Sequence, residues 1–297
     1  RKRVASELGI VLRGVGGIYD VETSGGKVIR CRPRGRIKQS LAILAGDRVR
    51  YLPLSENEGV IEEVLPRTTV IYRPAVANVD QLIVVSACAR PDPQLMLIDK
   101  LLVLAESRGL RPVVCLNKVD LVPESVPEEL TAIYERAGYL VLRCSAKFGV
   151  GIDQLRRCLE GKTSSFAGPS GAGKSSLLNA VQPGLRLTTG KVSRKTGRGR
   201  QTTRQVALLP LECGGYVADT PGFSQLRLDD LDGVELDSYF PELRKHKVNC
   251  RFTSCLHRSE PDCGVKEALA DGRIAPSRYE NYLLLLDELE QQARTRY

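Results

Sequence analysis

The chain has 297 residues, which is enough for two or three domains with a sizeable hydrophobic core. Hydrophobic residues make up 42% and charged residues 27%, the proportions of a soluble globular protein, and no apolar run is long enough to cross a bilayer. We see no signal peptide either, so we expect a cytoplasmic protein without a membrane partner. A net charge of +9 favours polyanionic partners, RNA above all, with a merely basic soluble enzyme as the alternative.

The first part of the chain, up to about residue 68, is rich in short strand-like segments separated by turns. A Gly25-Gly26 pair predicts a hairpin between the second and third segments. Five short strands in so little sequence fit a small closed barrel, of which the OB-fold is the common basic example. The predicted strands cover residues 10–12, 17–21, 27–31, 47–51 and 59–64.

A group of cations between residues 30 and 38, which begins at the end of the third predicted strand, is assigned to one loop. Such a loop suits a nucleic-acid backbone, and a solvated surface loop is the alternative. Its members are Arg30, Arg32, Arg34, Arg36 and Lys38.

After a predicted linker at residues 66–74, the pattern changes to alternating strands and helices, which is typical of a parallel α/β sheet. Asp92 and Pro93 are predicted to cap a helix that runs to Gly109. Residues 188–205 are basic and rich in Gly and Thr without periodicity, so we expect a mobile loop there. Further strands are predicted at 80–86, 112–116, 139–143, 163–167, 206–211 and 215–218, and further helices at 128–137, 152–159 and 175–181.

A phosphate-binding loop is predicted where Gly168-Pro-Ser-Gly-Ala-Gly-Lys-Ser175 matches G-x-x-x-x-G-K-[ST] between a strand and a helix. Glycines let backbone N–H groups converge on phosphate oxygens at a helix N-terminus, Lys174 reaches the β and γ phosphates, and Ser175 ligates Mg²⁺. An ordinary Gly-rich turn is the alternative. The predicted nucleotide contacts here are Gly168, Pro169, Ser170, Gly171, Ala172, Gly173, Lys174, Ser175 and Ser176.

Guanine-reading residues are predicted at the ends of two strands that precede this loop. Asp120 can accept from the ring N–H and the exocyclic amine of guanine, a pair of donors that adenine does not offer. Asn117 supports the base, the stem of Lys118 covers its face, and Ser145-Ala146 presents backbone N–H to the guanine carbonyl. The two motifs comprise Asn117, Lys118, Val119 and Asp120, then Ser145, Ala146 and Lys147.

The remaining phosphate motif is Asp219-Thr-Pro-Gly222. Asp219 is expected to hold Mg²⁺ through water, and the Gly222 N–H to face the γ-phosphate. Guanine-reading motifs normally follow the phosphate motifs, whereas here they precede them, so we predict a circularly permuted domain. The last motif then runs directly into the C-terminal region, so a nucleotide-driven movement can act on whatever that region holds.

A metal site is predicted near the C-terminus, where Cys250-x4-Cys255-x-His257-x5-Cys263 offers three thiolates and one imidazole. This set is typical of one closed, structural Zn²⁺ site, and unligated buried thiols are the alternative. The other six cysteines are dispersed, which argues against a disulfide framework. A capping box at Ser277-x-x-Glu280 starts a final helix through Leu289, and its leucines are expected to pack within the C-terminal domain rather than bind a partner.

The permuted motif order, the N-terminal barrel, the sequences GRQTTR and DTPGF, and the Cys/His tail together resemble the RsgA (YjeQ/YloQ) family. The resemblance implies three domains: an OB-fold at residues 1–68, a circularly permuted GTPase at 69–230 and a mostly helical zinc-binding domain at 231–297. It also implies slow GTP hydrolysis that the small ribosomal subunit stimulates, contact with ribosomal RNA, and action late in the maturation of that subunit.

Two residues bear on how water is activated. The family usually has G-R-H-T-T where this chain has Gly199-Arg-Gln-Thr-Thr203, so Gln201 could orient a water but not take its proton. Phe223 stands where some GTPases place a water-positioning Gln. We therefore expect slow intrinsic turnover, with catalytic contributions from Lys174, Gln201, Gly222 and whichever of Thr202 and Thr203 reaches Mg²⁺.

Three functions fit these residues. The leading one is Mg²⁺-dependent GTP hydrolysis by direct water attack, gated by the small ribosomal subunit, in a monomeric protein. The second is a nucleotide-sensing RNA-binding assembly factor with vestigial hydrolysis. A failure of the small ribosomal subunit to stimulate GTP hydrolysis would favour it. The third, an ATP-dependent small-molecule kinase, requires Asp120 to be irrelevant and is excluded by selectivity for GTP over ATP.

Overall fold

A computed structural model describes residues 5–35, 42–72, 75–185, 206–219, 231 and 233–295. The chain divides into two compact units, one of residues 1–80, 159–165 and 184–223 and the other of 81–158, 166–183 and 224–297. Among the described helices, none combines the length and the apolar character needed to cross a membrane.

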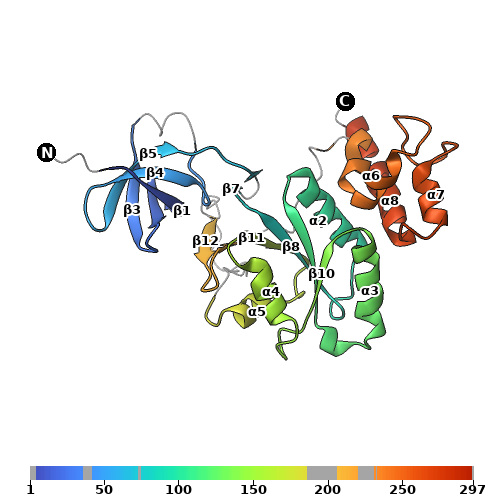
Figure 1. Ribbon diagram of the computed structural model, residues 1–297, viewed down its shortest axis with the longest axis horizontal. Coiled ribbons are helices and arrows are strands. Elements are labelled where there is room, and N and C mark those ends of the chain that lie inside the picture. The colour runs from blue at the N-terminus through green and yellow to red at the C-terminus, as the bar shows by residue number, and fades with distance from the viewer. Residues whose placement is uncertain are drawn as a thin grey trace, which may run out of the picture. The chain divides into compact units, whose positions relative to one another are not determined.

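The N-terminal strands close into the predicted barrel, in the order β1-β2-β3-β5-β4 (Figure 1). The neighbouring strands are antiparallel except for β3 and β5, which are parallel. Alternate side chains point inward and build one core from Val11, Val21, Ile29, Cys31, Val49, Tyr51 and Ile61. The strands are β1 (Glu7–Val15), β2 (Ile18–Thr23), β3 (Val28–Pro33), β4 (Arg48–Pro53) and β5 (Glu58–Val64).

The assignment of the cations to one loop was wrong in part. Arg30 and Arg32 lie on β3 with exposed side chains, because Ile29 and Cys31 take the inward positions of that strand. Arg34 follows the strand and pairs with Glu62 at 2.6 Å. Arg36 and Lys38 lie outside the described residues.

The segment after the barrel is also more ordered than a linker. Strands β6 (Val70–Tyr72) and β7 (Ala75–Ala77) pair antiparallel. The buried Asn78 amide fixes this segment, since it accepts from the Thr68 N–H at 2.9 Å and donates to the Gly46 carbonyl at 2.9 Å. These side-chain bonds, which composition does not reveal, explain why the linker prediction failed.

The α/β sheet has six strands in the order β10-β9-β8-β11-β13-β12. Strands β8, β9 and β10 are parallel, and β12 and β13 form an antiparallel hairpin, as predicted. Every residue of β8 is buried, as expected for a strand covered on both faces. The strands are β8 (Gln81–Ala87), β9 (Arg111–Asn117), β10 (Leu140–Cys144), β11 (Thr163–Ala167), β12 (Ala207–Pro210) and β13 (Tyr216–Asp219).

The helices of this region are α2 (Leu95–Ser107), α3 (Ser125–Arg136), α4 (Ile152–Leu159) and α5 (Lys174–Val181). The predicted cap of the first was wrong: the N-cap is Gln94, without a side-chain bond, rather than Asp92. Packing decides this start, because the apolar face of α2 becomes buried only from Ile98 onward. Helix α3 ends before Gly138 as predicted, and this glycine has a φ of +94° that other residues rarely adopt.

The C-terminal elements are η3 (Gly233–Tyr239), α6 (Pro241–Lys247), α7 (Gly264–Ala270) and α8 (Pro276–Thr295), and Figure 1 shows the three helices gathered together in orange and red. Leu285, Leu286 and Leu289 of α8 are buried, as predicted, whereas Leu284 is exposed. Helix α8 also contacts α2, where Lys100 pairs with Glu288 at 2.7 Å.

Candidate nucleotide site and metal centre

The phosphate loop joins β11 to α5, as its motif requires. Gly168 has a φ of +140°, and a Cβ there would lie 2.0 Å from the Val85 carbonyl oxygen. Gly173 has a φ of +95°, and a Cβ there would lie 2.2 Å from the Asn117 amide nitrogen. Both positions therefore exclude any side chain, and this lets the loop close against the ends of β8 and β9.

Lys174 is held inside this loop. Its ammonium donates to the carbonyl oxygens of Gly168 at 2.8 Å and Pro169 at 2.9 Å. No carboxylate contacts it among the described residues, and burial lowers the pKa of Lys174. The cation is therefore satisfied only by neutral dipoles, which phosphate oxygens could replace.

Asn117 joins the three segments in which nucleotide contacts are predicted. Its side chain is almost fully buried, at 1% exposure. The amide nitrogen donates to the Ala172 carbonyl in the phosphate loop at 2.9 Å, and the amide oxygen accepts from the Ala146 N–H at 3.3 Å. The end of β9, the phosphate loop and the loop after β10 thus share one hydrogen-bonded side chain.

Asp120 and Ser145 are also brought together. The buried Ser145 hydroxyl donates to an Asp120 carboxylate oxygen at 2.5 Å and accepts from the Phe148 N–H at 3.3 Å. Asp120 itself is exposed, so its carboxylate is accessible to a base. Lys118 has a left-handed backbone with a φ of +62° and donates to the Arg90 carbonyl. Val119 begins the short helix η1 (Val119–Leu121).

The remaining predicted residues divide into three groups. Ser170, Gly171 and Ser176 are exposed, Ser175 is half-buried, and Lys147 is exposed with its ammonium 4.9 Å from the centre of the Phe148 ring. Asp219 ends β13, but its side chain is not among those described. Four residues, with the mobile loop predicted at 188–205, fall outside the described residues: Gln201, Thr202, Thr203 and Gly222.

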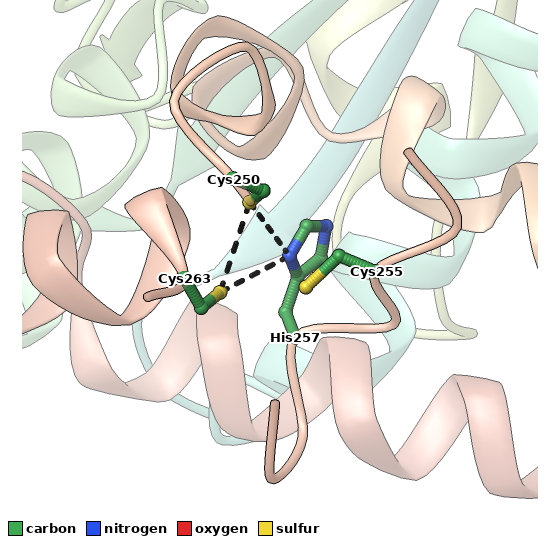
Figure 2. A group of neighbouring side chains, drawn as sticks. All are labelled: Cys250, Cys255, His257 and Cys263. Carbon is green, nitrogen blue, oxygen red and sulfur yellow. Dashed lines mark hydrogen bonds between the residues drawn. The ribbon is translucent and has the colours of Figure 1, made fainter. Parts of the chain in front are cut away.

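The four predicted metal ligands converge, as Figure 2 shows. The ligand atoms of Cys250, Cys255, His257 and Cys263 all lie within 4.8 Å of one another. Burial raises the pKa of the Cys255 thiol to about 12, so a thiolate there needs a cation beside it. Three sulfurs and one imidazole in this arrangement match the donor set of a closed tetrahedral Zn²⁺ site.

Motif spacing did not identify two acidic residues beside this cluster. Asp237 in η3 approaches the outer ring nitrogen of His257 at 3.0 Å and pairs with Lys247 at 2.7 Å. Burial raises the pKa of Asp237, but the hydrogen bonds from His257 and Lys247 outweigh burial and leave it lowered. Glu260 accepts from the N–H groups of Leu256 and Arg258, each at 2.7 Å, and so shapes the loop around His257. In the sequence, the only sign of a role for Glu260 is its position between the predicted ligands His257 and Cys263.

Known proteins match this chain along nearly its whole length. The family described as RsgA N-terminal domain matches residues 8–61, and the RsgA GTPase family matches residues 64–229. The small ribosomal subunit biogenesis GTPase RsgA of Moorella thermoacetica is 49% identical over 97% of this chain and 99% of its own. The protein of the same name from Caldanaerobacter subterraneus subsp. tengcongensis is 47% identical over 97% of this chain and 98% of its own.

Two solved structures share the fold. YjeQ from Thermotoga maritima superposes with a TM-score of 0.86 at 44% identity, covering 96% of this chain and 98% of its own. YloQ, described as a circularly permuted GTPase, superposes with a TM-score of 0.85 at 34% identity, covering 98% of each chain. In this chain too, the predicted guanine-reading motifs, at residues 117–120 and 145–147, precede the phosphate-loop motif at 168–175. The chain therefore belongs to the RsgA family of circularly permuted GTPases.

Proposed function

We propose that this protein hydrolyses GTP to GDP and phosphate, that the small ribosomal subunit stimulates the reaction, and that it acts late in the maturation of that subunit. The observation that carries the proposal is the Asn117 side chain, which links the phosphate loop to both guanine-reading segments. The names of the relatives, small ribosomal subunit biogenesis GTPase RsgA, support the choice of partner. This partner makes the cytoplasm the expected location, and we expect the chain to act as a monomer.

The guanine base would be read by Asp120, which accepts from its two adjacent N–H groups. The Ser145 hydroxyl donates to one oxygen of this carboxylate, so the second oxygen would accept from the base. The segment from Asn117 to Asp120 and the segment from Ser145 to Lys147 would enclose the base. An adenine would leave the carboxylate without its donors, at a penalty of about 1–3 kcal/mol for each unpaired group.

The triphosphate would lie against the phosphate loop from Gly168 to Ser176. Lys174 would exchange its two carbonyl partners for phosphate oxygens, which satisfies its charge more fully. Ser175, Asp219 and one of Thr202 and Thr203 would hold Mg²⁺, which when bound neutralises phosphate charge. Gly222 would donate its N–H to the γ-phosphate, and Gln201 would orient the attacking water.

Slow intrinsic turnover follows from the absence of a proton acceptor at these positions. An amide such as Gln201 can orient water but cannot take its proton, and the phenyl ring of Phe223 offers no hydrogen bond. Groups supplied by the ribosomal subunit would then complete the site, which is why we expect stimulation.

Contact with ribosomal RNA is assigned to the barrel. Arg30 and Arg32 point outward on β3, and the structure records no carboxylate partner for either among the described residues. Unpaired, exposed guanidinium groups bind phosphates and release counterions, so this binding should weaken as salt rises. We retain residues 1–68, 69–230 and 231–297 as the three proposed domains.

The cluster at the C-terminus is proposed to hold one structural Zn²⁺ per chain. All four donors are used, which leaves no open position for catalysis at the metal. Elemental analysis should find one zinc per chain, and Cys255→Ser should lower zinc content while leaving the affinity for GDP unchanged. A zinc-free wild-type chain would contradict the assignment.

The function is tested by measuring GTP hydrolysis in Mg²⁺ with and without purified small ribosomal subunits. Lys174→Ala serves as the blank, because it removes the cation that contacts the phosphates. We expect strong stimulation of the wild-type protein and none of the variant. Tight GDP binding without any stimulation would instead identify a nucleotide-sensing assembly factor.

A further inference from the structure

The two ring nitrogens of His257 face different partners. Nδ1 lies 3.6 Å from the Cys250 sulfur and 3.4 Å from the Cys263 sulfur, so it points into the cluster (Figure 2). Nε2 points out of the cluster and lies 3.0 Å from an Asp237 carboxylate oxygen. Each nitrogen therefore has one possible role: Nδ1 as a metal ligand and Nε2 as a hydrogen-bond donor.

We propose that Asp237 is the positioning residue of the metal site, which accepts a hydrogen bond from His257 Nε2–H and so fixes Nδ1 as the nitrogen that binds metal. The inference rests on the zinc site proposed above. A neutral imidazole carries one proton, and the opposite tautomer would turn a lone pair of Nε2 toward the carboxylate. Repulsion between the two would then push the ring away from the cluster.

Burial makes this contact strong. The His257 side chain is 0% exposed and that of Asp237 is 3% exposed, so water competes little for either group. The same Asp237 oxygen also accepts from Lys247 at 2.7 Å, which holds the carboxylate in place from the other side. The second Asp237 oxygen is buried without a partner in the described structure. The carboxylate is thus positioned entirely through the oxygen that meets the ring.

Other residues already hold the backbone of the ligand loop, so Asp237 is not needed for that purpose. Glu260 binds the N–H groups on either side of His257, and the Tyr279 hydroxyl donates to the His257 carbonyl at 2.6 Å. Neither of these is recorded hydrogen-bonding the imidazole ring. Asp237 lies on η3, well before the ligand segment in the sequence, and among the described residues it alone is recorded hydrogen-bonding Nε2.

The test compares zinc-loaded wild-type chain with Asp237→Ala and Asp237→Asn. Nitrogen-15 NMR of the histidine rings reports which nitrogen is bound to metal, and a chromophoric chelator measures the rate of zinc release. We expect metal on Nδ1 in the wild-type chain. Release should be about 10- to 100-fold faster in Asp237→Ala, the usual effect of losing such a partner, and intermediate in Asp237→Asn.

Tyr279→Phe is the matched control, because it loosens the same loop without touching the ring. Its zinc release should be much closer to that of the wild-type chain. Metal bound through Nε2 in the wild-type chain, or equal release rates for the wild-type chain and Asp237→Ala, would overturn the proposal. If Asp237→Ala does not fold, equal release from Asp237→Asn and the wild-type chain overturns it. A wild-type chain without zinc would refute the metal site itself, and that outcome is distinct from a failure of Asp237.

Discussion

One unit of this molecule holds a buried cation, Arg278, and a half-buried one, Lys174, and the two are satisfied in opposite ways. Arg278 on α8 is 1% exposed and pairs with Asp99 at 2.7 Å and with Glu242 at 2.7 Å, while its guanidinium lies 4.5 Å from the centre of the Phe240 ring. Lys174 in the phosphate loop is half-buried, and among the described residues its ammonium is recorded donating only to two backbone carbonyls.

The pKa of each group follows from its partners. Burial by itself lowers the pKa of Arg278, but the charges of Asp99 and Glu242 outweigh burial and raise it. At Lys174 no negative charge is recorded, among the described residues, that would offset the effect of burial, so the pKa of Lys174 is lowered. The difference shows that a cation paired with buried carboxylates is already satisfied inside the protein, whereas a cation held by neutral carbonyls has weak partners that an anion can displace, as predicted for Lys174.

The largest effect is expected at Arg278. Arg278→Met would leave the carboxylates of Asp99 and Glu242 buried without a cation, so the free energy of unfolding should fall by about 3–5 kcal/mol. Urea unfolding of the two proteins at neutral pH measures this loss. The matched control is Arg273→Met, because Arg273 pairs with Asp271 while 45% exposed, and its loss should change stability by less than about 1 kcal/mol.

Removing the charges of the two carboxylates left without a cation should restore most of the lost free energy of unfolding. Adding Asp99→Asn and Glu242→Gln to Arg278→Met removes both buried charges, so the triple variant should be more stable than the single one. If Arg278→Met unfolds at the same urea concentration as Arg273→Met, the buried pairing does not hold α8 on α2.

Asn117 provides an intermediate case, because its side chain is buried and hydrogen-bonded at both ends yet belongs to the predicted nucleotide site. Asn117→Ala removes two hydrogen bonds that hold the phosphate loop and the segment after β10 in place, each with a net value of about 1 kcal/mol. If GDP binding has to restore this order, GDP should bind more weakly by up to roughly 30-fold. Titration with a fluorescent GDP analogue measures this change.

Gln81→Ala is the matched control for that variant. Gln81 is also a buried amide that donates to a carbonyl, that of Cys158 at 2.9 Å, but it begins β8 at the opposite end of the strands from Asn117. Its replacement should lower stability and leave GDP affinity unchanged. Equal losses of affinity in both variants would show that Asn117 acts only through the stability of the sheet.

The sequence could predict those parts of the molecule that demand fixed residue types at fixed spacing. Gly168 and Gly173 have no room for a side chain, and the four predicted metal ligands of the Cys/His cluster come from one short segment, so a linear pattern records both. The barrel followed from alternation and turn residues for the same reason.

Contacts between distant segments could not be predicted. The partners of Arg278 lie on α2 and α6, and Asp237 reaches His257 from η3, so no local spacing marks them as partners. The start of α2 at Leu95 shows the same limit, since packing overrode the capping preference of Asp92. The outward placement of Arg32 depended on where β3 ended, because the predicted strand stopped at Cys31 and propensity gives a strand end only to within a few residues.

The smallest effect expected is a pH dependence of stability at Lys174. Below its lowered pKa, Lys174 is charged in both the folded and the unfolded chain, so burial of the ammonium destabilises the fold in full. As pH rises through that value toward about 10.4, the pKa of an unfolded lysine, the folded chain releases its proton first. The free energy of unfolding of the nucleotide-free wild-type chain should therefore rise relative to Lys174→Met over this window, as measured by urea unfolding at several pH values. A relative fall would mean that the two loop carbonyls stabilise the ammonium, and that Lys174 resembles Arg278 more than its contacts indicate.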